Sequence, residues 1–314
     1  MTYIRDHKAD RDLTVGRDIF GGHDFLAPAK NQAEIVLYAA ALKALQNGQI
    51  PTALMTTTNS LEIAITDTNG ERAQYTQECH AMIALHRNKI LGRNDHFWAL
   101  GAPDETVLKS PEHAIEALAE LYCRPIEFGL VERLDHWEGA KLMPDLWGKV
   151  VTLHPYVQSK RATYKKPIQF LFLPPWILRQ KYTVDEATDV VNEAIKERAE
   201  MLNDTRTTRL GTSRVLGKKG CRRLDPLGRR DGSPRRQPQP DFRGTKKQVL
   251  DAIAALRAYR AYYAGCIEHF RADRKDVVFP RGVVMMRKLG AYCDPHPPSR
   301  VEYPWHIFTR PPDS

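Results

Sequence analysis

Between residues 13 and 122 the sequence switches repeatedly between two hydrophobic periods, and this alternation constrains the fold more than any other feature. Strand-like stretches alternate apolar and polar residues, whereas helix-like stretches place apolar residues three or four positions apart. In chain order the segments are a strand at 13–20, a helix at 31–46, strands at 51–58 and 61–66, a helix at 72–90, a strand at 106–108 and a helix at 111–122. This order is typical of a ferredoxin-like α+β sandwich, an antiparallel sheet with helices on one face.

Turn residues and a change in amino-acid composition divide the rest of the chain. Pro125 is expected to stop the helix at 111–122, and Pro and aromatic residues become frequent after Trp137. A charged amphipathic helix is predicted at 185–202 and a long helix at 245–274. The predicted parts are a disordered N-terminus (1–12), an α+β domain (13–140), an irregular linker with a helix (141–205), a basic arm (206–247), a mostly helical C-terminal segment (248–293) and a Pro-rich tail (294–314).

The basic arm holds most of the excess positive charge. It carries fourteen Lys and Arg against three Asp and Glu, whereas the whole chain is only +9, so the remaining residues are close to neutral. Arg forks and Lys ammonium groups in an extended, Pro- and Gly-containing segment are suited to phosphate groups. The residues expected to bind nucleic acid are Arg206, Arg209, Arg214, Lys218, Lys219, Arg222, Arg223, Arg229, Arg230, Arg235, Arg236, Arg243, Lys246 and Lys247.

Composition argues against several other classes of protein. The five cysteines are odd in number and form no C-x-x-C pair, which favours reduced thiols over a disulfide framework or a zinc ribbon. No stretch approaches the ~18 apolar residues that a membrane span needs, and the polar start does not resemble a signal peptide. We therefore expect a cytoplasmic protein, associated with the nucleoid or a ribonucleoprotein, with no membrane partner.

Two stretches of the chain resemble a known family. They are TTTNSLEIAITDTNGERAQYTQECHAMIALHRNKILGRNDHFW at 56–98 and YCRPIEFGLVERLDHWEG at 122–139. Together they resemble the REP-associated tyrosine transposases, which are single-tyrosine HUH transposases. Members of that family commonly show N-H-x-H on a strand and, later, N-P-V-x-x-G-L-V followed by a Trp. Here the second motif reads Arg124-Pro125-Ile126, then Gly129-Leu130-Val131 and Trp137.

The resemblance implies a specific chemistry and also where this chain departs from it. In the family, two His on one strand help to hold a divalent metal, and a Tyr attacks the scissile phosphate of single-stranded DNA. In this chain the two His positions carry Ser60 and Glu62, and the helix that follows offers only Tyr75. Glu62 is the candidate ligand for Mg²⁺ or Mn²⁺, and Tyr75 the candidate nucleophile, only if the protein is active. His80 and His86 are expected to be surface residues rather than ligands.

Arg and Tyr residues also alternate on the predicted helix at 245–274. Tyr259 and Tyr263, with Leu256 and Ile267, are expected to form its packed stripe. Arg257 and Arg260 then face away from that stripe, and we expect some of these Arg to contact nucleic acid.

These observations favour a degenerate, catalytically inactive transposase-like protein that binds DNA or RNA and needs no cofactor. It is expected to serve as a structural part of a larger nucleoprotein complex. One alternative is an active single-strand endonuclease that forms a 5′-phosphotyrosine intermediate. A second alternative is a protein-interaction module whose basic arm binds an acidic partner.

Overall fold

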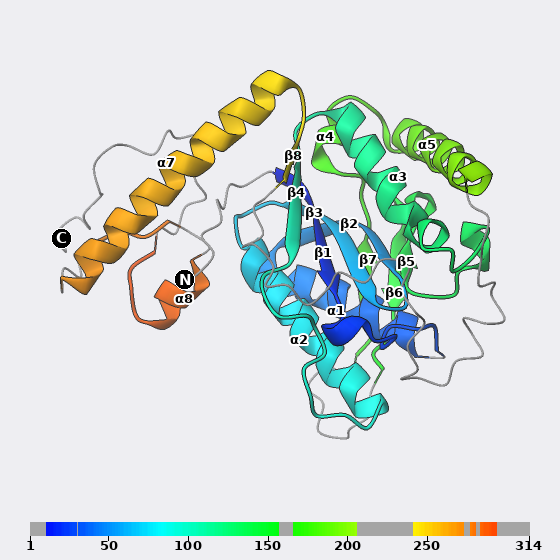
Figure 1. Cartoon of the computed structure of the whole chain (residues 1–314), viewed down its shortest axis with the longest axis horizontal. Coiled ribbons are helices and arrows are strands. Elements are labelled where there is room, and N and C mark those ends of the chain that lie inside the picture. The colour runs from blue at the N-terminus through cyan, green and yellow to red at the C-terminus, as the bar shows by residue number, and fades with distance from the viewer. Residues whose placement is uncertain are drawn as a thin grey trace.

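The structure is a computed structural model of the whole chain (Figure 1). It describes residues 11–29, 31–156, 166–205, 241–272, 277–280 and 283–293. Most of the basic arm, the Pro-rich tail and nearly all of the predicted N-terminal segment therefore lie outside the described residues. None of the helices in the described part of the chain combines the length and the apolar character that crossing a membrane requires.

A six-stranded sheet with the order β5-β2-β3-β1-β4-β8 forms the centre of the molecule. Its strands are β1 (Arg11–Asp18), β2 (Gln49–Thr56), β3 (Ser60–Asp67), β4 (Asp104–Leu108), β5 (Lys141–Leu142) and β8 (Asp241–Arg243). All neighbouring strands are antiparallel except β4 and β8. The inner order β2-β3-β1-β4 is that of a ferredoxin-like sandwich, so the predicted α+β fold is confirmed.

Two helices cover one face of this sheet, as the sequence predicted. They are α1 (Gln32–Asn47) and α2 (Arg72–Ile90). Gln32 Nε2 of α1 donates to Thr56 Oγ1 of β2 at 3.2 Å, and Arg72 Nη2 of α2 lies 3.2 Å from Glu105 Oε2 of β4. These two contacts show which face of the sheet α1 and α2 cover. Because side chains alternate along a strand, it is the face toward which Leu61, Ile63 and Ile65 of β3 point.

The opposite face of the sheet is also covered, which the sequence did not predict. Helices α3 (Pro111–Glu127) and α4 (Trp176–Arg179) contact it, and α5 (Val184–Thr205) packs against α3. Asp12 of β1 accepts hydrogen bonds from the first two backbone N–H groups of α4, at 3.0 and 2.6 Å. The central strands are buried along nearly their whole length, so both of their faces need a covering layer.

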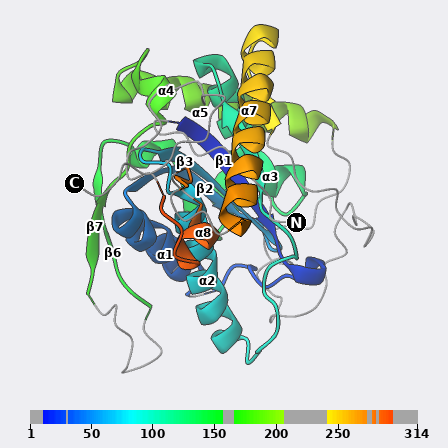
Figure 2. The same cartoon turned by 90° about the vertical axis from the view of Figure 1, so that its left-hand side faces the viewer.

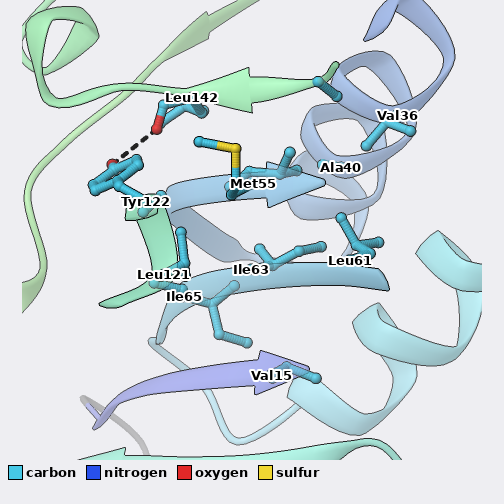
Figure 3. Close-up of a cluster of buried hydrophobic side chains, with 14 of the residues drawn as sticks. Val15, Val36, Ala40, Met55, Leu61, Ile63, Ile65, Leu121, Tyr122 and Leu142 are labelled. Carbon is cyan, nitrogen blue, oxygen red and sulfur yellow. Dashed lines mark hydrogen bonds between the residues drawn. The ribbon is translucent and has the colours of Figure 1, made fainter. Parts of the chain in front are cut away.

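A single hydrophobic core continues through the position at which the sequence suggested a boundary. It runs from Leu13 of β1 to Ile195 of α5 and includes Trp147 and Phe170 of the predicted linker. Figure 3 shows Val36 and Ala40 of α1 and Tyr122 of α3 on different sides of β2 and β3. Tyr122 Oη donates to the carbonyl of Leu142 in β5 at 2.8 Å, which ties the start of the linker to the sheet. The linker also forms a two-stranded antiparallel ribbon of β6 (Val150–Leu153) and β7 (Ile168–Leu171).

The C-terminal helices lie beyond the β8 edge of the sheet (Figure 1, Figure 2). The long helix α7 (Lys246–Arg271) confirms the prediction at 245–274, and α8 (Val284–Lys288) follows. Thr245 and Gln248 form a capping box at the start of α7. A second, small hydrophobic cluster joins Tyr263 and Cys266 of α7 to Val277, Phe279 and Met286. The predicted packed stripe of α7 is confirmed, because Leu256, Tyr259 and Tyr263 are buried.

Candidate functional site

The strand positions that the resemblance singles out face helix α3. Glu62 Oε1 accepts a hydrogen bond from Arg124 Nε at 2.8 Å, and Arg124 Nη1 donates to Glu127 Oε2 at 2.8 Å. The guanidinium therefore lies between two carboxylates, one from β3 and one from its own helix. The Glu62 and Arg124 side chains are only 20% and 30% exposed, so water screens this ion pair weakly.

Local sequence places both partners. Gly16 of β1 is the cross-strand neighbour of Glu62, and a Cβ at Gly16 would lie 3.7 Å from Glu62 Cγ. That is an ordinary van der Waals contact, so the pairing places Glu62 beside Gly16 without crowding. Arg124 is helical because α3 continues to Glu127, so the prediction that Pro125 would stop the helix earlier was wrong. A proline in the last turn removes one backbone hydrogen bond but does not force the helix to end there.

Burial and charge act in opposite directions on Glu62. Burial raises the pKa of its carboxyl group above the ordinary value, and the positive charge and hydrogen bond of Arg124 lower it in part. Burial by itself lowers the pKa of Arg124, but the charges of Glu62 and Glu127 outweigh that effect and raise it. Each partner thus stabilises the charged form of the other.

Ser60 occupies the other strand position that the resemblance assigns to a His. It is buried, and its hydroxyl shares a 2.6 Å hydrogen bond with Thr57 Oγ1. Thr57 Oγ1 also accepts from the backbone N–H groups of Asn59 and Ser60, at 3.3 and 3.0 Å. These bonds form a turn at the start of β3, so the Ser60 hydroxyl has a structural partner.

Tyr75 lies on the other side of the sheet from Glu62. It belongs to α2, whereas Glu62 points toward α3, so the structure does not bring the two residues together. Tyr75 is 1% exposed, and burial, followed by the effects of Cys79, raises the pKa of its hydroxyl well above the ordinary value. A phosphate cannot reach this hydroxyl in the structure, and the hydroxyl is held in its protonated form.

The two His of α2 are buried, contrary to the prediction that they lie on the surface. The His80 ring packs 4.8 Å from the Trp98 ring, and the His80 carbonyl accepts from Trp98 Nε1 at 2.8 Å. Burial lowers the pKa of His86, so this ring favours its neutral form. Both His belong to the face of α2 that packs in the core. Across the residues that the structure describes, no group of three His, Cys, Asp or Glu is arranged to hold a metal ion.

Three of the predicted nucleic-acid-binding residues lie within the described part of the basic arm. Arg243 is engaged internally, because its Nη2 lies 2.6 Å from Glu120 Oε2 of α3. Lys246 and Lys247 are exposed on the first turn of α7. The predicted residues outside the described residues are Arg206, Arg209, Arg214, Lys218, Lys219, Arg222, Arg223, Arg229, Arg230, Arg235 and Arg236.

Arg124 is the residue of this site that sequence reasoning missed. The signal was present, because Arg124 stands where the resembled motif has Asn in N-P-V, just as Glu62 stands in place of a His. These two departures from the motif are 62 positions apart in the chain and 2.8 Å apart in the structure. Only the packing of α3 on β3 shows that they form a pair.

The fold and the site define an α+β protein with a ferredoxin-like sheet and an Arg–carboxylate cluster on one face. No protein-family model and no curated protein matches the chain. Among solved structures, the chain is similar to a REP-associated tyrosine transposase bound to a REP hairpin, with a TM-score of 0.38 and 11% identity. That similarity covers 44% of this chain and 81% of the transposase chain.

Proposed function

We propose that this protein binds nucleic acid through its basic residues and does not cleave it, as a transposase-like fold that serves a structural role. The observation that carries the proposal is the ion pair between Glu62 and Arg124. It places the positively charged Arg124 guanidinium 2.8 Å from Glu62, the one carboxylate that the resemblance would assign to a metal. DNA or RNA in a larger nucleoprotein complex is the partner that the proposal includes.

The residues on this face do not fit a divalent metal. Mg²⁺ and Mn²⁺ need several anionic or strongly donating oxygen ligands. The Glu62 carboxylate is already neutralised by Arg124, and the neutral Ser60 hydroxyl is bonded to Thr57. A divalent cation here would have to displace a guanidinium that two carboxylates hold. A metal-dependent cleavage step at this site is therefore not part of the proposed function.

The position of Tyr75 supports the same conclusion. A nucleophilic hydroxyl must reach the phosphorus atom and be activated, usually by a nearby base or by a lowered pKa. Tyr75 lies in the core on the far side of the sheet, and its pKa is raised. Among the described residues, Tyr75 therefore meets neither requirement for strand cleavage.

The charge distribution supports binding. The basic arm brings fourteen cationic side chains, and eleven of them precede β8. Each phosphate that such side chains neutralise releases counterions, so affinity falls steeply with added salt. A protein that binds in this way needs no active site, which agrees with the pairing of Glu62 with Arg124.

The test measures binding and cleavage separately on one labelled hairpin, prepared as DNA and as RNA. We expect salt-dependent binding without a covalent adduct when Mn²⁺ is present. Replacement of the eleven arm residues from Arg206 to Arg236 by Gln should lower the affinity by about 100-fold or more at low salt. A 5′-phosphotyrosine adduct would overturn the proposal in favour of the endonuclease. Unchanged hairpin affinity in that variant, or binding of acidic proteins that survives nuclease treatment, would overturn it in favour of another surface or a protein partner.

A further inference from the structure

Helix α7 presents a row of cationic side chains beside its buried side. An α-helix completes about three turns in eleven residues, so residues eleven positions apart lie one above the other. Lys246 and Arg257 form one such pair and Arg260 and Arg271 form another. Arg257 and Arg260 are three positions apart, so the two pairs lie near one line along the helix. Lys246, Arg257 and Arg271 are exposed, and Arg260 is half-buried. We call these four residues the α7 stripe. It carries one acidic neighbour, Glu268.

Among the described residues, the α7 stripe differs from Arg72, Arg124 and Arg243 in having no ionic partner. Arg72, Arg124 and Arg243 each lie within 4.0 Å of a carboxylate. Among the described residues, no carboxylate lies within that distance of any stripe residue. Glu268, three positions before Arg271, forms no ion pair with it in the described structure. Internal ion pairs thus neutralise those three arginines, whereas the charges of the α7 stripe are available to an external anion.

The start of α7 is fixed to the sheet, so the stripe has a defined place. Arg243 of β8 pairs with Glu120 of α3 at 2.6 Å, and Gln248 Nε2 donates to the carbonyl of Lys109 at 3.1 Å. The Lys109 backbone N–H in turn donates to the carbonyl of Arg243 at 2.9 Å. These bonds hold the first turn of α7 against the end of β4. The α7 stripe therefore begins directly where the basic arm joins the sheet.

The length of the stripe matches a base-paired stem. Lys246 and Arg271 are 25 positions apart, or about 38 Å along the helix axis at ~1.5 Å per residue. One turn of B-form DNA is about 34 Å long. We propose that the α7 stripe lies against the sugar-phosphate backbone of a double-stranded stem. This inference rests on the proposed function, and it names the part of the ligand that α7 contacts.

The inference predicts contacts that do not depend on base sequence. Phosphate contacts position a nucleic acid and carry no direct sequence information. We therefore expect the stripe to contribute equally to stems of different sequence.

The experiment replaces all four stripe residues by Gln, which has a helix propensity close to that of Lys and Arg. The variant is Lys246→Gln, Arg257→Gln, Arg260→Gln and Arg271→Gln in the full-length chain. A matched control removes the same charge from four exposed lysines on other segments, namely Lys89→Gln, Lys149→Gln, Lys166→Gln and Lys196→Gln. Dissociation constants are measured against salt for a 20-base-pair DNA stem, the corresponding RNA stem and a single strand of either kind; the stem length is about two helical turns. Circular dichroism checks that both variants are folded.

We expect the stripe variant to lose about 0.9 from the salt slope for each phosphate contact, or up to ~3.6 in total, on a stem. The control should keep the slope of the natural sequence. A smaller salt slope for the stripe variant on the DNA stem, the RNA stem or both supports the inference and identifies the nucleic acid. A stripe variant that matches the control on both stems, or that loses as much slope on single strands, overturns it. If the natural chain binds no nucleic acid in a salt-dependent way, the proposed function fails as well.

Discussion

Replacement of Arg124 by Ala should destabilise the protein in a way that depends on Glu62 and on pH. The variant leaves the half-buried Glu62 carboxylate without its cationic partner and close to Glu127. Exposed ion pairs contribute about 0.2–1 kcal/mol, whereas removing one partner of a fully buried pair costs about 3–5 kcal/mol. The Glu62 and Arg124 side chains are 20% and 30% exposed, which lies between these cases. We therefore expect a loss of about 2 kcal/mol at pH 7, or roughly 4–8 °C in Tm.

The pH dependence follows from the direction of the pKa change. Arg124 lowers the pKa of Glu62, so its removal raises a pKa that burial has already raised. A carboxyl group with a raised folded-state pKa contributes stability below its unfolded pKa of 4.5, and that contribution is lost as pH rises through the folded pKa. The cost of Arg124→Ala, compared with the natural chain at the same pH, should therefore be largest near pH 7. It should shrink as the pH falls toward 4.5.

Urea unfolding of a double-mutant cycle provides the measurement. Glu62→Gln in the Arg124→Ala background removes the orphaned charge, so the double variant should be more stable than Arg124→Ala alone. The matched control is Arg198→Ala, which removes an arginine of similar exposure that pairs with Glu120 instead. Its effect should add to that of Glu62→Gln. A coupling energy below ~0.3 kcal/mol between Arg124 and Glu62, or a cost that is the same at pH 4.5 and pH 7, would refute the reasoning.

Two further predictions concern the packing that surrounds this site. Asp12→Asn should cost about 1–3 kcal/mol, because the carboxylate accepts from two backbone N–H groups of α4 and from the Thr66 hydroxyl, and an amide group cannot accept them all. Limited proteolysis of the chain after residue 166 should then become faster, because α4 is held less firmly. An unchanged cleavage rate would contradict the role assigned to Asp12 in holding α4. Gly139→Ala should cost about 1–3 kcal/mol, because its Cβ would lie 2.6 Å from the buried Trp137 ring. Thermal unfolding measures that loss, and Gly16→Ala is the comparison for added side-chain bulk, because its Cβ would make only an ordinary 3.7 Å contact.

The hydrophobic periods of the sequence determined most of the fold. The predicted helices at 31–46, 72–90 and 245–274 match α1, α2 and α7 closely. They were predictable because each has an apolar stripe at helical spacing and a clear end, such as Gly48 in the left-handed conformation after α1. Local pattern and local turn chemistry carry this information without any long-range contact.

The errors arose where distant segments decide the environment. His80 and His86 were expected at the surface, since polar residues usually are exposed, but the packing of α2 against the sheet and against the Trp98 loop buries them. The helices on the second face of the sheet were also missed. The hydrophobic period of a strand shows which of its residues are apolar, but it does not show which element covers each face. Pro125 was taken as a stop signal, although α3 continues through it to Glu127.

The sequence by itself determined the order of strands and helices, the location of the excess positive charge and the departure of Ser60 and Glu62 from the resembled motif. Only the tertiary structure decided what that departure means. The register of β3 turns Glu62 toward α3, and the helical continuation through Pro125 turns Arg124 toward Glu62. The same arrangement leaves Tyr75 in the core on the opposite face. Residues far apart in the chain acquire a common role only when packing brings them within the few ångströms over which charges and hydrogen bonds act.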